Sequence, residues 1–260
     1  MKVLLFLFSI SVLLCSCDQS KTKATTVTTE QPTKKIDYPE QLVKVFNNHG
    51  SLVKWKSMKA LSYEIVKKEG NEKQIINLHS RAERIEASNF TSGFDGKQYW
   101  VEADTSYDGN AKFYTNLIFY FYAMPFVLAD DGIEYTEVDP LVFEGMSYPG
   151  FRISYNDGVG ISPEDEYFIY YDPKTYEMAW LGYTVTYFSG EKSKKISFIR
   201  YNDWKEFKGV KLPNSLTWYK VEEGKIIEPR NTRQFINVNL SKTALPATTF
   251  AKTDNAKIVE

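Results

Sequence analysis

The chain has little cysteine, little histidine and no excess of charge. Its 2 cysteines both lie in the first seventeen of 260 residues, which excludes disulfides and cysteine-based chemistry from the rest. The 32 basic and 33 acidic residues nearly cancel, which disfavours nucleic-acid binding. Glycine-rich phosphate loops and the hydrolase patterns GxSxG and HExxH are absent. What the chain does have is 18 Tyr, 17 Phe and 5 Trp, residues that favour β-strands.

The N-terminus carries a targeting segment. Residues 1–17, MKVLLFLFSISVLLCSC, contain one early lysine and then an apolar run too short to span a bilayer, the layout of a secretory signal. The run ends Leu14-Cys15-Ser16-Cys17, which resembles the bacterial lipobox. The resemblance implies cleavage after Ser16 and lipidation of Cys17. Cys15 does not fit, because bulky Leu14 would precede it. An ordinary secretory signal cleaved nearby is the alternative.

The segment after the signal is polar. Residues 18–37 contain six Thr, four Lys and almost no apolar side chains, so this stretch cannot offset the entropy of ordering. We therefore expect a signal peptide over 1–16, a lipidated cysteine and flexible tether over 17–37, and one β domain over 38–260. We place the protein in the cell envelope, anchored to a membrane through Cys17. Asp18 does not decide which membrane, although we expect the outer rather than the inner one.

The body begins with a helical pattern and continues as short strands. Pro39-Glu40 opens an amphipathic helix over 39–57, broken near Gly50. After Lys59, aromatic and β-branched runs separated by turn residues indicate an antiparallel meander. Hairpin signals include Asp95-Gly96 and Lys208-Gly209. We expect strands near 60–68, 73–80, 81–88, 97–103, 133–138, 141–147, 150–156, 165–172, 176–188, 194–207, 210–222 and 225–240.

One segment interrupts the meander. Residues 113–128 are apolar nearly all round, which predicts a buried helix that Pro125 kinks or ends. This helix either fills the core or acts as a movable plug over a ligand pocket. The fold class is thus mainly β with few helices. We expect a strongly curved antiparallel sheet or incomplete β-barrel, closed by the N-terminal helix and the central apolar segment.

Several motifs resemble known families. Asn48-His49-Gly50-Ser51, FDGKQYW at 94–100, PFVLAD at 125–130, YDPKT at 171–175 and GVKLP at 209–213 resemble an uncharacterised family of lipoproteins from Gram-negative bacteria. The chain is also distantly similar to the carriers and receptors of the outer-membrane lipoprotein-sorting pathway. That likeness implies an incomplete barrel around a cavity for acyl chains. Neither resemblance assigns a catalytic residue.

Metal and cofactor chemistry has little support. The 2 histidines, His49 and His79, lie on different predicted elements, and His49 suits a helix end or a cavity mouth. Residues 156–166 hold four carboxylates without the spacing of an EF-hand. We expect no metal and no cofactor.

Three functions stay open. The first is a non-catalytic, lipid-anchored protein that binds an apolar ligand such as an acyl chain, a lipid or a lipoprotein anchor. The second is an envelope hydrolase with a polar site around His49 and Asp130, joined by Asp131 or Glu164. The third is an assembly partner that contacts an envelope protein through an aromatic sheet face. For the first, the expected lining is Trp55, Leu117, Phe119, Phe121, Phe126, Trp180 and Trp218.

Overall fold

A computed structural model describes residues 38–130, 132–155, 165–186 and 195–259. The signal, Cys17 and the tether therefore lie outside the described residues, as do Asp131, Glu164 and most of the acidic loop 156–166. Residues 36–260 form one compact unit. No helix in the described ranges is both long and apolar enough to cross a membrane.

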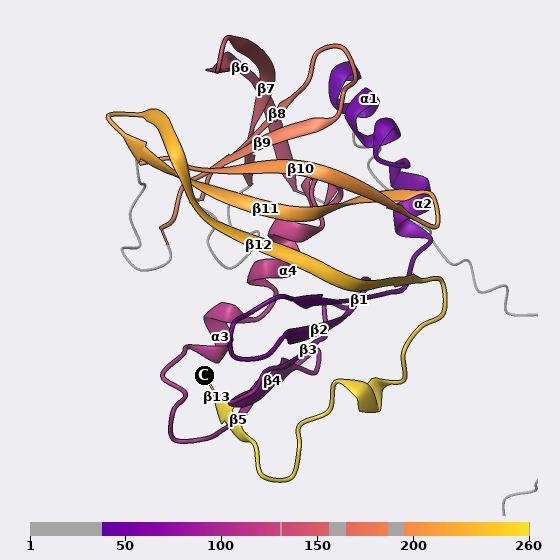
Figure 1. Cartoon of the computed structure of the whole chain (residues 1–260). Helices are drawn as coiled ribbons and strands as arrows, with labels where there is room; N and C mark the ends of the chain where they lie inside the picture. Colours follow the sequence, from indigo (N-terminus) through magenta and orange to yellow (C-terminus); the bar gives the residue numbers. More distant parts are fainter. Residues whose placement is uncertain (1–37, 131, 156–164, 187–194, 260) are drawn as a thin grey trace, which may run out of the picture. The chain divides into compact units, whose positions relative to one another are not determined.

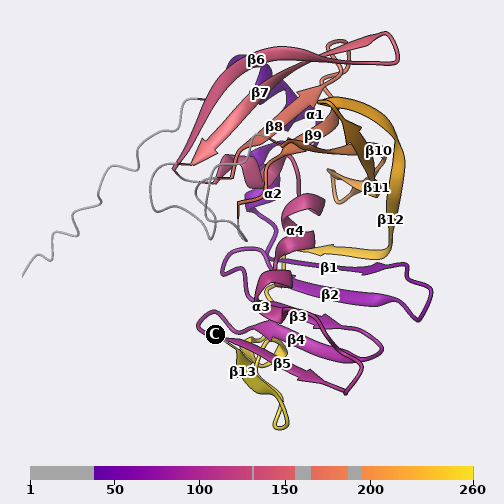
Figure 2. The ribbon, with the colours of Figure 1, turned by 90° about the vertical axis from the view of Figure 1, so that its left-hand side faces the viewer.

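The strands form one antiparallel sheet with two free edges in the order β13-β5-β4-β3-β2-β1-β12-β11-β10-β9-β8-β7-β6 (Figures 1 and 2). The sheet is curved and does not close into a barrel, which confirms the expected fold class. The described strands are β1 Ala60–Ile65, β2 Glu72–Asn77, β3 Glu83–Glu86, β4 Phe90–Phe94, β5 Tyr99–Ala103, β6 Ile133–Phe143, β7 Met146–Tyr155, β8 Tyr167–Tyr171, β9 Met178–Tyr183, β10 Ser197–Phe207, β11 Val210–Glu222, β12 Lys225–Ser241 and β13 Lys257–Val259.

Strand β12 joins the two halves of the sheet. Its first part pairs with β11, and its last part, from Phe235 to Ser241, pairs with β1. The long strand thus carries the hydrogen-bonded ladder from the N-terminal half to the C-terminal half (Figure 1). A bulge interrupts the β11–β12 pairing, because Trp218 pairs with Asn231 while Tyr219 pairs with Pro229, which leaves Arg230 as the extra residue.

The hairpins explain why the strand boundaries differ from those expected. Asp95-Gly96 and Lys208-Gly209 form turns as predicted. Residues 133–143 form one strand where two were expected, and the next turn falls at Glu144-Gly145. Both turn residues have positive φ, 50° and 78°, the conformation of a tight two-residue hairpin. A Glu-Gly pair signals such a turn less clearly than Asp-Gly does.

Two strands were not expected from the sequence. Strand β4 contains Gly93, a weak strand former, but a side chain there would meet Trp100 at 2.7 Å. The glycine therefore permits a close approach inside the sheet. Strand β13 pairs with β5 across more than 150 positions of sequence, a contact that local patterns do not reveal.

The helices are short and pack on one face of the sheet, here called the helical face. Helix α1 buries Leu42, Val45 and Phe46 at helical spacing, and the expected break at Gly50 is confirmed, since its φ is +111°. The central segment forms three pieces, with Pro125 between the second and third, and Phe119, Phe126 and Leu128 become core residues. The described helices are α1 Glu40–Asn48, α2 Leu52–Lys56, α3 Ala111–Tyr114, α4 Leu117–Tyr122 and the 3₁₀ turns η1 Phe126–Ala129 and η2 Ala247–Thr249.

Candidate functional site

A groove runs along the helical face beside α3 and α4. It has a volume of about 310 Å³, at the small end of the range for ligand sites. Helices α3 and α4 supply one wall, and strands β9 to β12 supply the other. Its lining residues are Phe113, Leu117, Ile118, Phe121, Tyr183, Val185, Ser197, Trp218, Tyr219, Arg230, Asn231 and Arg233.

Phe121 fixes the floor of the groove. Its ring centroid lies 5.0 Å from that of Tyr183 and 5.9 Å from that of Trp218. The Tyr201 hydroxyl donates to the Phe121 carbonyl oxygen at 2.5 Å, so the end of α4 is held against β10. Trp218 Nε1 donates to the Tyr183 hydroxyl at 3.1 Å. These contacts hold the aromatic wall in place without filling the space beside it.

Three of the seven expected lining residues meet at this groove: Leu117, Phe121 and Trp218. Three others lie in the packed core below it. Trp55 stacks on Phe126 with 4.8 Å between centroids and 9° between planes, and Phe119 is fully buried. Phe119 and Phe126 of the central segment therefore belong to the packed core, whereas Leu117 and Phe121 of the same segment reach the groove.

The structure places Trp180 elsewhere. Neighbouring residues of a strand point to opposite faces. On β9, Leu181 belongs to the main core and Trp180 to a smaller cluster on the second face of the sheet. There Phe143 of β6 and Tyr219 of β11 approach it, with centroid distances of 4.8 and 4.9 Å. The sequence did not distinguish the two faces because both sets of alternating residues in 176–188 are apolar.

Sequence reasoning missed the two arginines of the groove. In a regular strand, residues three apart lie on opposite faces, so Arg230 and Arg233 gave no joint signal. The bulge at Arg230 brings both arginines to the groove. A register shift of this kind depends on pairing with β11 and has no local sequence pattern.

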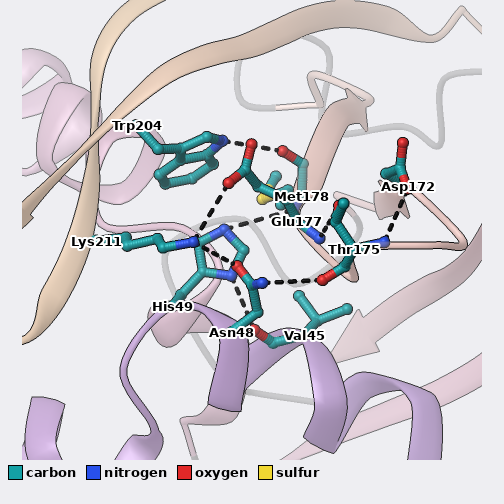
Figure 3. A network of polar contacts seen from close by, with 9 residues as sticks. All are labelled: Val45, Asn48, His49, Asp172, Thr175, Glu177, Met178, Trp204 and Lys211. Carbon is teal, nitrogen blue, oxygen red and sulfur yellow. Dashed lines mark hydrogen bonds and ion pairs between the residues drawn. The ribbon is translucent and has the colours of Figure 1, made fainter.

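A second polar site surrounds His49 (Figure 3). His49 follows the last residue of α1 and is fully buried. Its Nδ1 donates to the Val45 carbonyl oxygen at 2.8 Å, so its Nε2 accepts from the Met178 amide at 3.4 Å. The Trp204 ring packs edge-on against the imidazole at 4.4 Å. Both ring nitrogens are therefore occupied by the protein itself.

The electrostatics keep His49 neutral. Burial lowers the pKa of the imidazole to about 4, against a smaller opposing effect of the hydrogen bond to Val45, and the charge of Lys211 lowers it further. Lys211 Nζ in turn donates to Asn48 at 3.0 Å and lies 3.4 Å from Glu177 Oε2. The cluster joins α1 to the β8–β9 turn and to β11, a structural arrangement rather than an open catalytic one.

The expected partner of His49 lies in another cluster. Asp130 Oδ2 accepts from Arg81 Nη2 at 2.7 Å, and it does not belong to the network around His49 in Figure 3. Among the described residues, no three His, Cys, Asp or Glu side chains are grouped closely enough to hold a metal ion.

Buried acids lie behind the groove, between β2, β3 and the α3–α4 junction. Glu72 accepts from the Tyr114 hydroxyl at 2.8 Å, and Tyr114 lies 3.5 Å from Arg233 Nη1. Glu83 Oε2 accepts from the Asn116 amide at 2.5 Å. Burial raises the pKa of Glu83 to about 8; the Asn116 hydrogen bond opposes this, and the nearby Glu72 charge adds to it.

Comparison with known proteins gives a family and a few distant structures. No curated protein matches the chain. A LolA superfamily protein from Nitrosomonas europaea is 7% identical, with a TM-score of 0.44 over 80% of this chain and 96% of that one. A DUF1329 family protein from Desulfovibrio piger is 10% identical, with a TM-score of 0.47 over 80% of this chain and 97% of that one. These matches concern the fold alone.

The family match covers most of the groove but ends just before its lining residues Arg230, Asn231 and Arg233. Residues 94–229, just over half of the chain, match the profile of a family of unknown function (DUF6503). The matched range includes α3, α4 and strands β9 to β11. The chain belongs to the family of unknown function DUF6503.

Proposed function

We propose that this protein is a lipid-anchored envelope protein that binds an apolar ligand, such as an acyl chain, without catalysing a reaction. The observation that carries the proposal is the groove beside α4, where Leu117, Phe121 and Trp218 face a space that no described side chain fills. A linear hydrocarbon fits such a site because it requires apolar contact along its length and no fixed polar partner.

The energetics favour a chain over a compact ligand. Each methylene group moved from water into an apolar site contributes about 0.8 kcal/mol, which is roughly a fourfold gain in affinity. Binding strength should therefore rise with chain length until the groove is full. A compact polar molecule would gain little from the Phe121 and Trp218 rings.

The anchor belongs to the same proposal. Lipidation of Cys17 would hold the protein at a membrane, which we take to be the outer one. The polar residues 18–37 would serve as a flexible tether, and a flexible chain of this length has a typical end-to-end distance of roughly 25 Å. A groove on a tethered protein can receive a chain from the membrane or from a soluble partner.

The two other functions have no observation in their favour. The imidazole of His49 is buried, neutral and hydrogen-bonded at both nitrogens, so it is not placed to serve as a base for an external substrate. The second face of the sheet is covered by its own cluster around Trp180. The large apolar side chains exposed within the described ranges are all aliphatic or methionine: Val43, Val53, Val66, Val142, Met146, Val185, Ile227 and Ile258.

A matched pair of variants tests the proposal. Val185 lines the groove and is 43% exposed, whereas Val142 on β6 is 67% exposed and lies outside it. We expect Val185→Asp to weaken binding of a long-chain alcohol at least tenfold, since the chain would have to pass a charged group, and Val142→Asp to leave it unchanged. Calorimetric titration with alcohols of increasing length measures both effects. Affinity that does not depend on chain length, or equal loss in both variants, would refute the proposal.

A further inference from the structure

We propose that the ligand of the groove is a single acyl chain ending in a carboxylate, and that Arg230 and Arg233 bind this carboxylate at the groove's edge. This inference rests on the proposed function, because it assigns the head group of the same ligand. It concerns only the charged end of the site, so the two proposals can fail separately.

The backbone of β12 directs both arginines to one place. Without the bulge, residues 230 and 233 would point to opposite faces of the strand. The extra residue at Arg230 breaks the alternation opposite Trp218 and Tyr219, and both arginines then line the groove. Two cations beside an apolar groove match an anionic amphiphile, which carries a charged head on an apolar chain.

The two arginines form no direct ion pair with a described acid, and the Tyr114 hydroxyl stands between Arg233 and the buried Glu72. None of the groove-lining residues is an acid. The ion pairs between described residues include neither Arg230 nor Arg233. Arg233 contacts the Tyr114 hydroxyl at 3.5 Å and the face of Trp218 at 5.4 Å, which orients its guanidinium group without pairing its charge.

Neutral hydrogen-bonding groups surround the same edge. Tyr183, Ser197 and Asn231 also line the groove. Burial raises the pKa of Tyr183, while hydrogen bonds from Trp218 and Ser197 and the charges of both arginines lower it. The two guanidinium groups therefore act electrostatically on the hydroxyl that closes the aromatic wall. A carboxylate here would meet charged donors first, and charged donors form the stronger hydrogen bonds.

The size of the groove limits the ligand to one chain. A volume of about 310 Å³ lies at the lower limit for small-molecule sites, and Phe121 closes its floor. Planar guanidinium groups match a carboxylate in a two-point contact. We therefore commit to a fatty carboxylate rather than to a diacyl lipid.

The experiment compares dodecanoate with dodecanol, which has the same chain and no charge. Calorimetric titration uses the folded chain and the variants Arg230→Gln and Arg233→Gln. Lys225→Gln serves as the control, because Lys225 also lies on β12 and is exposed, but does not line the groove. Thermal unfolding of each variant verifies that it is folded.

The parent protein should bind dodecanoate about tenfold more tightly than dodecanol, since a hydrogen bond to a charged group contributes at least this factor. Each arginine variant should lose about tenfold in dodecanoate affinity and keep its dodecanol affinity, whereas Lys225→Gln should change neither. Dodecanoate binding alone should weaken as salt is added.

Equal affinity for the two ligands, or arginine variants that bind dodecanoate like the parent, would overturn the assignment of the head group and leave the apolar groove intact. If neither ligand binds, the proposed function is refuted together with this inference.

Discussion

Two buried side chains have strongly shifted pKa values, and His49 at the end of α1 is the first. Its pKa is about 4 in the folded protein against 6.5 in the unfolded chain. Between these values the unfolded state binds more protons, so the unfolding free energy falls as the pH falls from 6.5 towards 4. From about pH 7 to pH 5 this amounts to roughly 2 kcal/mol.

His49→Gln should remove this acid sensitivity. The variant loses stability near neutral pH, where the buried imidazole makes its contacts with Val45 and Met178. It should lose less stability near pH 5, because at that pH the parent protein is itself destabilised by the proton that only its unfolded state binds. Urea unfolding at the two pH values measures the difference. An unchanged slope of stability against pH in His49→Gln would contradict the buried, neutral imidazole.

The pKa of Glu83 is shifted upwards, and the stability of the protein therefore depends on pH in the opposite direction. Its pKa is about 8 in the folded protein, against an ordinary value of 4.5 for a solvated glutamate. Here the folded state binds more protons between the two values, so stability falls as the pH rises through this window. Glu83→Gln keeps a hydrogen-bond acceptor for Asn116 and cannot ionise. From about pH 5 to pH 8 the variant should gain roughly 3 kcal/mol relative to the parent. A constant difference across this range in urea unfolding would show that Glu83 is charged in the folded state.

At the scale of elements, the break between α1 and α2 depends on a close backbone contact. A Cβ atom on Gly50 would lie 2.1 Å from the Gly209 carbonyl oxygen, and the φ of +111° disfavours any side chain. Gly50→Ala should therefore destabilise the protein by roughly 3 kcal/mol, the sum of backbone strain and the steric clash.

Gly145→Ala is the matched control. Gly145 also has a positive φ, +78°, but a Cβ there would meet nothing within 4 Å. This variant should cost only about 1 kcal/mol, from backbone strain alone. Chemical denaturation of the two variants measures the difference. Equal losses would mean that the approach of α1 to the β10–β11 turn is not tight.

The elements show which parts of this fold can be predicted from sequence. The break at Gly50, the Asp95-Gly96 hairpin and the antiparallel meander followed from local chemistry, because turn residues and alternation act over a few positions. Strand β4 did not, because a glycine at position 93 is explained only by its close contact with Trp100 in the folded sheet. The groove was half predicted: Phe121 and Trp218 were named from their apolar settings, whereas the arginines required the bulge in β12.

At the scale of the whole molecule, the anchor and the groove are separate requirements. Cys17→Ser should move the protein from the membrane fraction to the soluble fraction, because the thiol that takes the lipid is lost. Cys15→Ser, a substitution of the same kind two positions earlier, should leave it in the membrane. Fractionation of cells that express each variant measures this. A Cys17→Ser protein that stays in the membrane, or two variants that behave alike, would exclude lipidation at Cys17.

The central claim is that the groove holds an acyl chain, and native mass spectrometry tests it most directly. The protein purified from a bacterial envelope should carry one single-chain fatty ligand per molecule, and Val185→Asp, prepared in the same way, should carry much less. A parent protein that is free of any bound amphiphile, or a ligand retained equally by Val185→Asp, would contradict the account.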